Sequence, residues 1–422
     1  MFKWATDLYP LNRSLSGEGN RQTLRYLKGL VPDLNIRDFK SGEVAFDWVI
    51  PDEWNVNEAY IENMSGVRLV DFSVSNLHLV GYSQPIDRVI EKEELLEHLH
   101  FVPELPDAIP YVTSYYARNW GFCLSKNQLD ELGDGPFRVF IDSAFKSGAQ
   151  GGSLNYGEIF LPGNSKQEIL FSTYICHPSM ANNELSGPVI ATALAKLLRT
   201  RNHHFSYRFL FLPETIGAIS YISKNLQSLQ ESVVAGWVLT CLGDAGEFSY
   251  IPSRTGDNFA DRITRSVLQQ THPSYLTYSW LNRGSDERQY CAPGVDLPIC
   301  SVTRSKYATY SGYHTSLDDL NFISENSLSE SLSMFLRIID KMESCRLPKI
   351  RVLCEPQLGK RGLYSNISTR ESYLHSTQNL NNVISFLDGN HSIEEIAHKC
   401  HISVADTVLI VDELITQGLV YL

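Results

Sequence analysis

One histidine, His177, lies at a position in the sequence where a functional side chain is expected. The apolar run 169–175 ends close to His177, and a short polar loop then leads through Ser186 and Gly187 into a segment rich in helix-forming residues, 188–198. This order of strand, loop and helix places His177 at the carboxyl end of a buried strand, where open α/β sheets bind their ligands. A histidine there can be a metal ligand, a general base or a hydrogen-bonded structural residue.

Four later stretches also have the look of loops that end strands. Each carries an acid or a histidine, the residue types that bind metals or move protons. The four stretches are Pro213–Gly217 with Glu214, Thr240–Asp244, Arg283–Glu287 with Asp286, and Tyr313–Asp319 with His314. Their side chains are the remaining candidates for a functional site.

The elements that must position these residues alternate between about residues 138 and 345. Alternation of strands and helices predicts an α/β fold, with a mostly parallel sheet flanked by helices. The predicted strands are Arg138–Asp142, Glu168–Ile175, Tyr207–Leu212, Ala235–Leu242 and Leu297–Val302, and the predicted helices are Pro188–Arg199, Thr215–Asn225, Asn258–Gln270 and Glu325–Met342.

The character of the sequence changes twice outside this α/β region. Residues 42–139 alternate in the manner of strands and are interrupted by recurring turn residues, which predicts an inserted β-rich module. This insert could be a lid that gates a substrate site, a dimerisation module or a structural insert. Residues 348–372 are polar and read as a linker. The α/β domain is therefore predicted to comprise residues 1–41 and 140–347.

Residues 373–422 are predicted to form a winged helix-turn-helix. Two Ser-x-x-acid helix starts, at Ser392 and Ser403, precede apolar-periodic segments, and Gly418 is a natural C-cap before a closing strand. Between residues 371 and 422 there are seven acids, and Lys399 is the single Lys or Arg. Phosphate contacts require basic residues, so this unit is expected to bind protein or to dimerise, and not to bind nucleic acid.

Composition narrows the class of protein further. A chain of 422 residues predicts two or three domains, and its net charge of −12 argues against a general binder of polyanions. None of the eight cysteines lies in a Cys-x-x-Cys pair, and the N-terminus lacks the apolar core of a signal peptide. No apolar run reaches about 18 residues, the length of a membrane span. A soluble cytoplasmic protein without a membrane partner is expected.

The site candidates, taken in order, resemble the motifs of the M28-type zinc aminopeptidases. In that family a strand ends in His-x-Asp, an Asp-x-x-Ser-Gly turn bridges two metals, and Glu-Glu-x-Gly supplies the general base. A Ser-Asp-His loop and a Tyr-His-Thr/Ser loop complete the site. The resemblance covers residues 1–40 and 140–345. With its insert and winged helix, the chain is similar to aminopeptidase-like proteins that are often labelled polysaccharide-biosynthesis proteins.

Residue by residue, the resemblance is incomplete. His177 and His314 match the two histidines, Glu214 matches the general base, and Asp286 matches the aspartate of the Ser-Asp-His loop. Five positions differ from the family pattern: Asn183 replaces the bridging aspartate, Thr215 the second glutamate, Thr240 a loop aspartate, Ser179 the aspartate of His-x-Asp and Glu287 the histidine after Asp286. Without a bridging carboxylate, two divalent ions would repel each other strongly, so a tight two-zinc site is not expected.

The resemblance implies one zinc ion per chain, bound by His177 and His314 with help from Asp286, Glu214 or Asn183. Asp244 is a further potential ligand. The metal would lower the pKa of a bound water, and Glu214 would take its proton and pass it to the leaving amine. The expected reaction is hydrolysis of an amide next to a free amino group, in a small peptide or an amine-bearing metabolite.

Each of these residues also has an ordinary structural interpretation. The histidines could be hydrogen-bonded scaffold residues, Glu214 could cap the helix that starts at Thr215, Asp286 could stabilise its loop, and Asn183 could be a turn residue. Two other functions therefore stay open. The chain could be a catalytically inactive binding module with an aminopeptidase fold, or a DNA-binding regulator, which the acidic C-terminal unit argues against. A homo-oligomer or a protein partner held through that unit is compatible with all of them.

Overall fold

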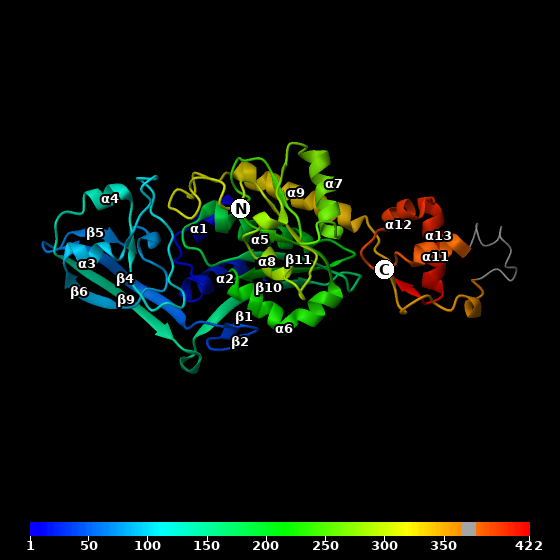
Figure 1. Cartoon of the computed structure of the whole chain (residues 1–422), viewed down its shortest axis with the longest axis horizontal. Helices are drawn as coiled ribbons and strands as arrows, with labels where there is room; N and C mark the ends of the chain where they lie inside the picture. Colours follow the sequence, from blue (N-terminus) through cyan, green and yellow to red (C-terminus); the bar gives the residue numbers. More distant parts are fainter. Residues whose placement is uncertain (364–376) are drawn as a thin grey trace.

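Three regions follow one another along the long axis of the molecule (Figure 1). They are the inserted β-rich region, the central α/β region and the C-terminal helical region. The structure, a computed structural model, describes residues 1–363 and 377–422. The end of the predicted linker and the first residues of the predicted C-terminal unit lie outside the described residues.

An eight-stranded sheet forms the centre of the molecule, with strand order β1-β10-β12-β11-β13-β16-β14-β15. The four strands β12, β11, β13 and β16 are parallel to one another, so their carboxyl ends lie at one edge of the sheet. The strands are β1 Asn35–Lys40, β10 Ser153–Leu161, β11 Glu168–Tyr174, β12 Ser206–Leu212, β13 Val233–Leu239, β14 Ser249–Ile251, β15 Leu276–Thr277 and β16 Ile299–Thr303.

Helices cover both faces of this sheet, and alternate residues of β11 point into the two resulting cores. Ile169 and Phe171 pack with one core and Leu170 with the other, as the period of two along a strand requires. The predicted α/β fold with a mostly parallel sheet between helices is confirmed. The first face carries α1 Phe2–Leu8, α2 Glu18–Leu30, α5 Ser186–Leu198, α7 Phe259–Thr271 and α9 Glu325–Glu343, and the second carries α6 Ile216–Ser232 and α8 Glu287–Tyr290.

The inserted region is built on an antiparallel four-stranded sheet of order β5-β4-β9-β6. The strand predicted over Arg138–Asp142 forms within β9, but it pairs with β4 and β6 and not in the central sheet. Its alternating burial suits a sheet with one covered face. The elements here are β2 Val44–Ala45, β3 Trp48–Val49, β4 Glu53–Asn63, β5 Arg68–Asp71, β6 Ile86–Ile90, α3 Lys92–Leu96, β7 Leu99–His100, β8 Phe122–Cys123, α4 Lys126–Asp130 and β9 Phe137–Lys146.

The C-terminal region is a winged helix, as predicted. Ser392 and Ser403 cap their helices, since each side chain accepts a hydrogen bond from a backbone N–H three residues later. Lys349 and Ile350, predicted to lie in the linker, form a strand that pairs with the closing strand, because Ile350 packs on the apolar core of this region. The elements are β17 Lys349–Ile350, α11 Gln378–Ile384, α12 Ile393–Cys400, α13 Val404–Thr416 and β18 Val420–Tyr421.

The start of α5 lies unusually close to the central sheet. A Cβ added at Gly187 would come within 2.3 Å of both the Leu239 carbonyl oxygen and the Thr173 hydroxyl, so a side chain cannot be accommodated there. Before α5, residues Ala181–Leu185 form a π-helical turn, an irregularity that is frequent at functional sites. This approach brings the polar loop after His177 against the ends of β11 and β13.

Two further observations concern the chain as a whole. All eight cysteines are unpaired, and seven of them are buried. Within the described residues, no helix has both the length and the apolar character needed to cross a membrane.

Candidate functional site

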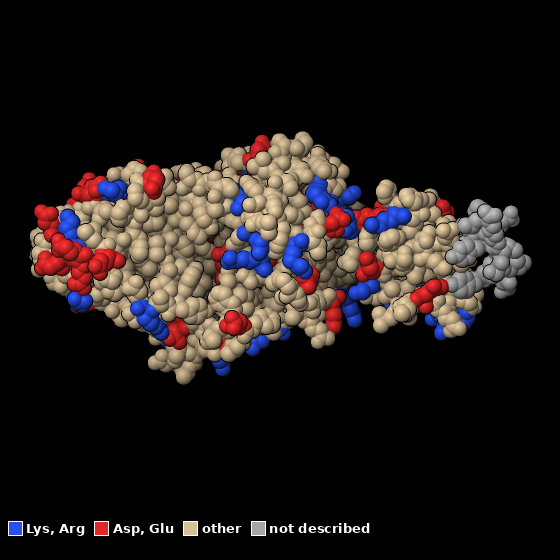
Figure 2. Space-filling model, in the orientation of Figure 1, with Lys and Arg blue, Asp and Glu red and all other residues tan. Residues whose placement is uncertain are grey.

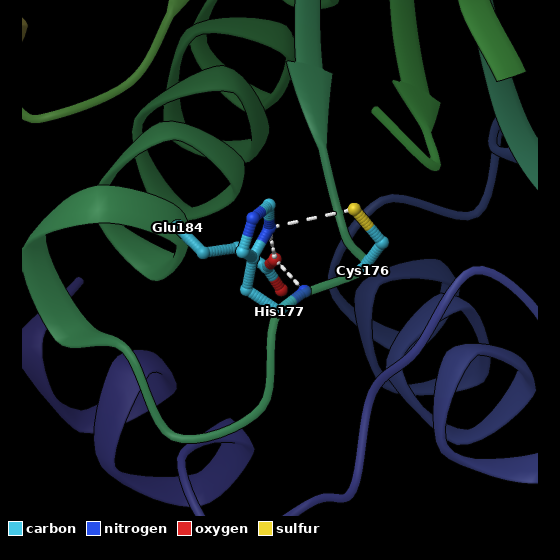
Figure 3. Close-up of side chains that lie close together, drawn as sticks. All are labelled: Cys176, His177 and Glu184. Atoms are coloured by element: carbon cyan, nitrogen blue, oxygen red, sulfur yellow. Dashed lines mark hydrogen bonds and ion pairs between the residues drawn. The ribbon is translucent and has the colours of Figure 1, made fainter. Parts of the chain in front are cut away.

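His177 lies just beyond the end of β11 and is held by a buried ion pair (Figure 3). Glu184, on the π-helical turn, accepts a hydrogen bond from the His177 backbone N–H, and its Oε2 lies 3.0 Å from His177 Nδ1. The other oxygen of Glu184 accepts a hydrogen bond of 2.6 Å from Arg13 Nε, and both side chains are fully buried. Burial lowers the pKa of His177, but the hydrogen bond and charge of Glu184, together with the charge of Glu214, more than offset this, and the net effect is a rise.

Cys176, His177 and Glu184 are the described residues that most resemble a metal cluster. Their potential ligand atoms lie within 4.8 Å of one another, the one such group of three or more His, Cys, Asp or Glu in the described part of the chain. The chemistry of this group does not fit a metal. Burial raises the pKa of the Cys176 thiol well above its ordinary value, whereas a metal needs the thiolate, and Glu184 is already paired with Arg13.

Glu214 follows β12, the neighbour of β11, and faces the free nitrogen of His177. Its Oε2 lies 3.8 Å from His177 Nε2, and its side chain is 20% exposed against 3% for His177. Its backbone N–H donates to Cys176 Sγ at 3.1 Å. Burial raises the pKa of Glu214, and the nearby His177 partly opposes this rise. A carboxyl group with a raised pKa beside an imidazole is suited to proton transfer.

Thr215 holds a strained backbone directly after Glu214. Its φ of 65° is rare for a β-branched residue and costs about 1–3 kcal/mol. Two contacts maintain the conformation: the Thr215 N–H donates to Asp286 Oδ1 at 2.7 Å, and Arg288 donates to the Thr215 hydroxyl at 2.8 Å. The strain therefore fixes the direction of the Glu214 side chain relative to the 283–288 loop.

Asp286 and Glu287 are buried acids on that loop. Glu287 Oε1 accepts hydrogen bonds from the N–H groups of Gly284 and Ser285 and from the Tyr307 hydroxyl. Burial, and then the charge of Glu214, raise the pKa of Asp286 well above its ordinary value. Asp286 Oδ2, Glu287 Oε2 and the Ser285 hydroxyl have no hydrogen-bond partner. Unsatisfied buried oxygens of this kind are costly in an empty protein and are expected where a ligand binds.

His314 lies on the third side of the site, with its ring centroid 5.1 Å from that of His177. Burial, together with the nearby His177, lowers the pKa of His314 to about 3, so this imidazole is neutral. Tyr313 stacks on His314 at 3.9 Å between centroids. Tyr111 of the inserted region packs on both histidines, at 5.0 Å from His177 and 5.4 Å from His314.

Asn183 is positioned by backbone and side-chain contacts. Its N–H donates to Asp318, which also accepts the Asn182 N–H, and its side-chain amide donates to the Tyr174 hydroxyl at 3.1 Å. Its Oδ1 is buried without a partner. Thr240 donates to the Asn183 carbonyl oxygen at 2.6 Å. Thr240 therefore stabilises the loop that contains Asn183. The resembling family has an acid at this position.

The structure places Glu214 and His314 each beside His177, but the ligand atoms of these three residues do not all lie within 4.8 Å of one another. Asp286 lies behind Thr215. Asp244 makes hydrogen bonds with Asn182 and Ser305, which occupy its carboxylate. Sequence reasoning missed Arg13, Glu184, Cys176, Asp318 and Tyr111. Arg13 and Tyr111 are far from His177 in the chain, and no local pattern connects them with it. Glu184 is seven residues from His177 and follows Asn183, so it could have been considered.

Two families match this chain. The family described as "Domain of unknown function (DUF4910)" matches residues 2–345, and a winged helix-turn-helix family matches residues 346–421. A protein from Clostridium acetobutylicum is 41% identical over 394 residues, which are 93% of this chain and 89% of that protein. Its provisional name is that of a polysaccharide biosynthesis protein with an aminopeptidase-like domain.

Solved structures with a similar fold include a C. acetobutylicum protein provisionally named as a peptidase. It is 38% identical, the match covers 100% of this chain and 95% of that one, and the TM-score is 0.80. A zinc aminopeptidase from Bacillus subtilis has a TM-score of 0.57 at 11% identity, with 81% of this chain and 94% of that chain covered. An M28 peptidase precursor from Shewanella amazonensis gives 0.55 at 10% identity, with 84% and 94% covered.

Proposed function

We propose, because this chain belongs to the DUF4910 family and has the fold of the M28 zinc aminopeptidases, that it is a hydrolase of that general kind. The substrate would be a small peptide or an amine-bearing metabolite, and the reaction would be cleavage of an amide next to a free amino group. The proposal assigns the role of general base to Glu214. It places the activity in the cytoplasm, where eight unpaired cysteines stay reduced.

The observation that carries the proposal is the pairing of Glu214 with His177. The two side chains come from neighbouring parallel strands, and they meet at 3.8 Å at the carboxyl edge of the sheet, where α/β folds bind ligands. Burial raises the pKa of Glu214 above its ordinary value, the direction that suits a carboxylate to accept a proton as a general base. Its partial exposure leaves it within reach of a substrate.

The residue types around this pair suit one zinc ion, but their ligand atoms do not all lie within 4.8 Å of one another, so zinc binding would require the side chains to move closer together. His177 and His314 would bind it together with the unpartnered side-chain oxygen of Asn183, and Glu214 would stay free to act as the base. Glu184 contacts His177 Nδ1, as carboxylates do when they orient zinc-binding histidines, and this leaves Nε2 available to a metal. A bound zinc ion would supply Lewis-acid polarisation of the amide carbonyl and of a water molecule.

The residues of the chain perform the remaining tasks. Glu214 takes a proton from the attacking water and returns it to the amine that leaves. Glu184 and Arg13 keep the His177 ring in one orientation and one tautomer, which removes the cost of ordering it during the reaction. The strained Thr215 backbone, tied to Asp286, keeps Glu214 aimed at His177.

A second function, a binding module without catalysis, is favoured by one observation. Thr215 and Thr240 occupy positions where the resembling family has acids, and both make structural hydrogen bonds here. With Asn183 at a third such position, the site has lost three carboxylates. Under this alternative the unsatisfied oxygens of the 285–287 loop bind a ligand that is not turned over.

Metal content and turnover separate the two functions. We expect about one zinc per wild-type chain after dialysis against zinc, lost in both His177→Ala and His314→Ala, and retained in the matched control His398→Ala on α12. Glu214→Gln should keep the metal and lower the turnover of an aminopeptidase substrate by roughly 10²–10⁴-fold. Metal measured by mass spectrometry with no turnover of any dipeptide would favour the binding module. A fully active Glu214→Gln protein would remove the base assignment.

For the winged helix we propose a protein contact, with another copy or another protein, and no nucleic acid or membrane partner. Its longest helix, α13, carries Asp406, Asp412 and Glu413 and no Lys or Arg. A DNA backbone would be repelled by this helix. Light scattering of the purified protein tests self-association, and a salt-dependent gel shift would contradict the proposal.

A further inference from the structure

A loop of the inserted region, residues 109–115, covers His177 and His314, and we call this loop the roof. Pro110 pairs with Thr315 in an antiparallel bridge, so the loop runs beside the segment that carries His314. The Tyr111 N–H donates to the His314 carbonyl oxygen and the Ser316 N–H to the Ile109 carbonyl oxygen, both at 2.8 Å. The Ser316 hydroxyl accepts from the Ile109 N–H at 2.9 Å. The roof is therefore fixed to the site and does not hang over it freely.

Tyr111 and Tyr115 are the side chains that this roof supplies. Tyr111 packs on both histidine rings, and burial raises its pKa well above the ordinary value, so its phenol is neutral. Tyr115 is 38% exposed and lies close enough to Glu214 for the charges to interact. Glu214 is 20% exposed and His177 only 3%, so a substrate would meet Glu214 first, beside Tyr115.

The solvent-exposed part of the 283–288 loop carries a positive charge. Arg288 is exposed, and its guanidinium is held beside Glu214 by the hydrogen bond of 2.8 Å to the Thr215 hydroxyl. Arg288 forms no ion pair within 4.0 Å with a carboxylate of residues 1–363 and 377–422, although its charge lowers the pKa of both Glu214 and Asp286. Figure 2 shows Lys and Arg side chains gathered over the region of α8, in the middle of this face. An exposed arginine without a carboxylate partner is suited to bind a planar anion.

Negative and positive charges therefore lie at opposite ends of the site. The interior presents the acids Asp286 and Glu287, each with an oxygen that lacks a partner, and the exterior presents Arg288. A molecule that satisfies both ends has a cation at its inner end and an anion at its outer end. Glu214 is close to both ends, because its charge acts on Asp286 and the charge of Arg288 acts on it, and the bond to be cleaved would lie beside it.

We propose that the site selects a compact amide whose leaving side carries an anionic group, bound by Arg288, and that Tyr111 and Tyr115 limit its length. A dipeptide with a free carboxylate has this pattern, as does an amide of an amino alcohol phosphate. The inference rests on the proposed hydrolase function. In the reaction water adds across the amide C–N bond: the acyl carbon gains the hydroxyl group, the nitrogen gains the proton, and the anionic amine leaves past Arg288.

The test compares charged and neutral versions of one substrate. L-leucyl-glycine and L-leucyl-glycinamide differ only in the terminal carboxylate, and L-alanyl-phosphoethanolamine tests whether phosphate is the preferred anion. We expect the zinc-loaded wild type to cleave the acid at least 10-fold more efficiently than the glycinamide. Arg288→Gln should remove this ratio. Cleavage of the glycinamide should also fall, because Arg288 holds the Thr215 hydroxyl beside Glu214, but it should fall less than cleavage of the acid, with the difference expressed in KM more than in kcat. Arg288→Lys should restore part of the ratio.

Arg283→Gln is the matched control. Arg283 lies on the same loop, but its guanidinium stacks on Trp280 at 4.6 Å. The ratio should be unchanged in this variant. If Arg288→Gln keeps the wild-type ratio, the anion site is wrong. A higher efficiency for the phosphate than for the dipeptide would identify phosphate as the anion and support the proposal.

The roof is tested with a longer substrate. L-leucyl-glycyl-glycine should be cleaved poorly by the wild type, and Tyr115→Ala should improve its cleavage relative to L-leucyl-glycine by several-fold. Equal cleavage of both peptides by the wild type would overturn the length limit.

A measurement of ligand binding tests the anion site independently of the proposed hydrolase function. Calorimetric titration of the Glu214→Gln protein with L-leucyl-glycine and its amide measures affinity without turnover. Tighter binding of the acid, lost in Glu214→Gln/Arg288→Gln, supports the anion site even if the wild type hydrolyses nothing. Equal binding of the acid and the amide would overturn it.

Discussion

Buried charges are paired on one side of the site and left without partners on the other. On the histidine side, formed by Arg13, Glu184 and His177, opposite charges are paired at hydrogen-bond distance. On the acidic side, formed by Ser285, Asp286 and Glu287, three buried oxygens lack partners and two carboxylates lie near Glu214. The histidine side has one unpartnered atom, Arg13 Nη2.

The difference shows on which side the buried charges already have partners and on which side a ligand could supply them. A buried charge needs a partner and hydrogen bonds for its remaining lone pairs, and Glu184 has both. Asp286 has one hydrogen bond and like charges around it, so burial and repulsion raise its pKa. The charges of the histidine side are thus already compensated, whereas the acidic side costs free energy that a bound cationic group would offset.

The largest expected effect comes from breaking the histidine side. Glu184→Gln removes the charge that pairs with Arg13 and leaves a buried guanidinium uncompensated, which should destabilise the central domain by about 3–5 kcal/mol. Scanning calorimetry of the full chain measures the loss. In Arg13→Met/Glu184→Gln the loss should be smaller than the sum of the two single variants. Additive losses would mean that the pair does not act as a unit.

A smaller effect is expected from placing a carboxylate between the two sides. Asn183→Asp puts an uncompensated charge on a buried atom that has no partner, near Asp318, and should destabilise the metal-free protein by about 2 kcal/mol. A zinc ion in the site would reduce this cost, because the new carboxylate could bind it. Melting temperatures with and without zinc test this, with Asn182→Asp as the control. A zinc response no larger than that of the wild type would argue against a metal beside residue 183.

The smallest expected effect comes from neutralising the acidic side. In the metal-free fold the pKa of Asp286 lies above its unfolded value of about 4, so the native state holds this proton more tightly. Its contribution is therefore fully present at low pH and is lost as the pH rises from about 4 through the raised pKa. Glu214 and Glu287 promote this loss, and Arg288 and the Thr215 N–H oppose it.

Asp286→Asn should remove that pH dependence. The variant keeps an acceptor for the Thr215 N–H and should be more stable than the wild type by about 1 kcal/mol at pH 8, with a smaller difference at pH 5. Chemical unfolding at both pH values measures the difference. A variant that is less stable than the wild type at pH 8 would show that the Asp286 charge is compensated.

The sequence allowed much of the fold and part of the site to be predicted. The apolar runs that became β11, β12 and β13 indicated the sheet, and the polar residues at their ends indicated His177 and Glu214. Arg138–Asp142 was assigned to the wrong sheet, because a strand pattern does not specify its partner. Asp286 and Asn183 were selected as ligands from a motif, and their roles as ligands stay predictions. Glu184 was overlooked, although its carboxylate is the direct partner of His177.

By itself, the sequence determined the periodicity of its elements, the places where strands end and the absence of acids at residues 183, 215 and 240. These are properties of neighbouring residues, and local rules describe them well. Only the tertiary structure decided that Arg13 pairs with Glu184 across 171 residues, or that Tyr111 of the insert covers both histidines. Such contacts depend on how separate segments pack, because a buried charge binds whichever partner the packing brings within hydrogen-bond distance.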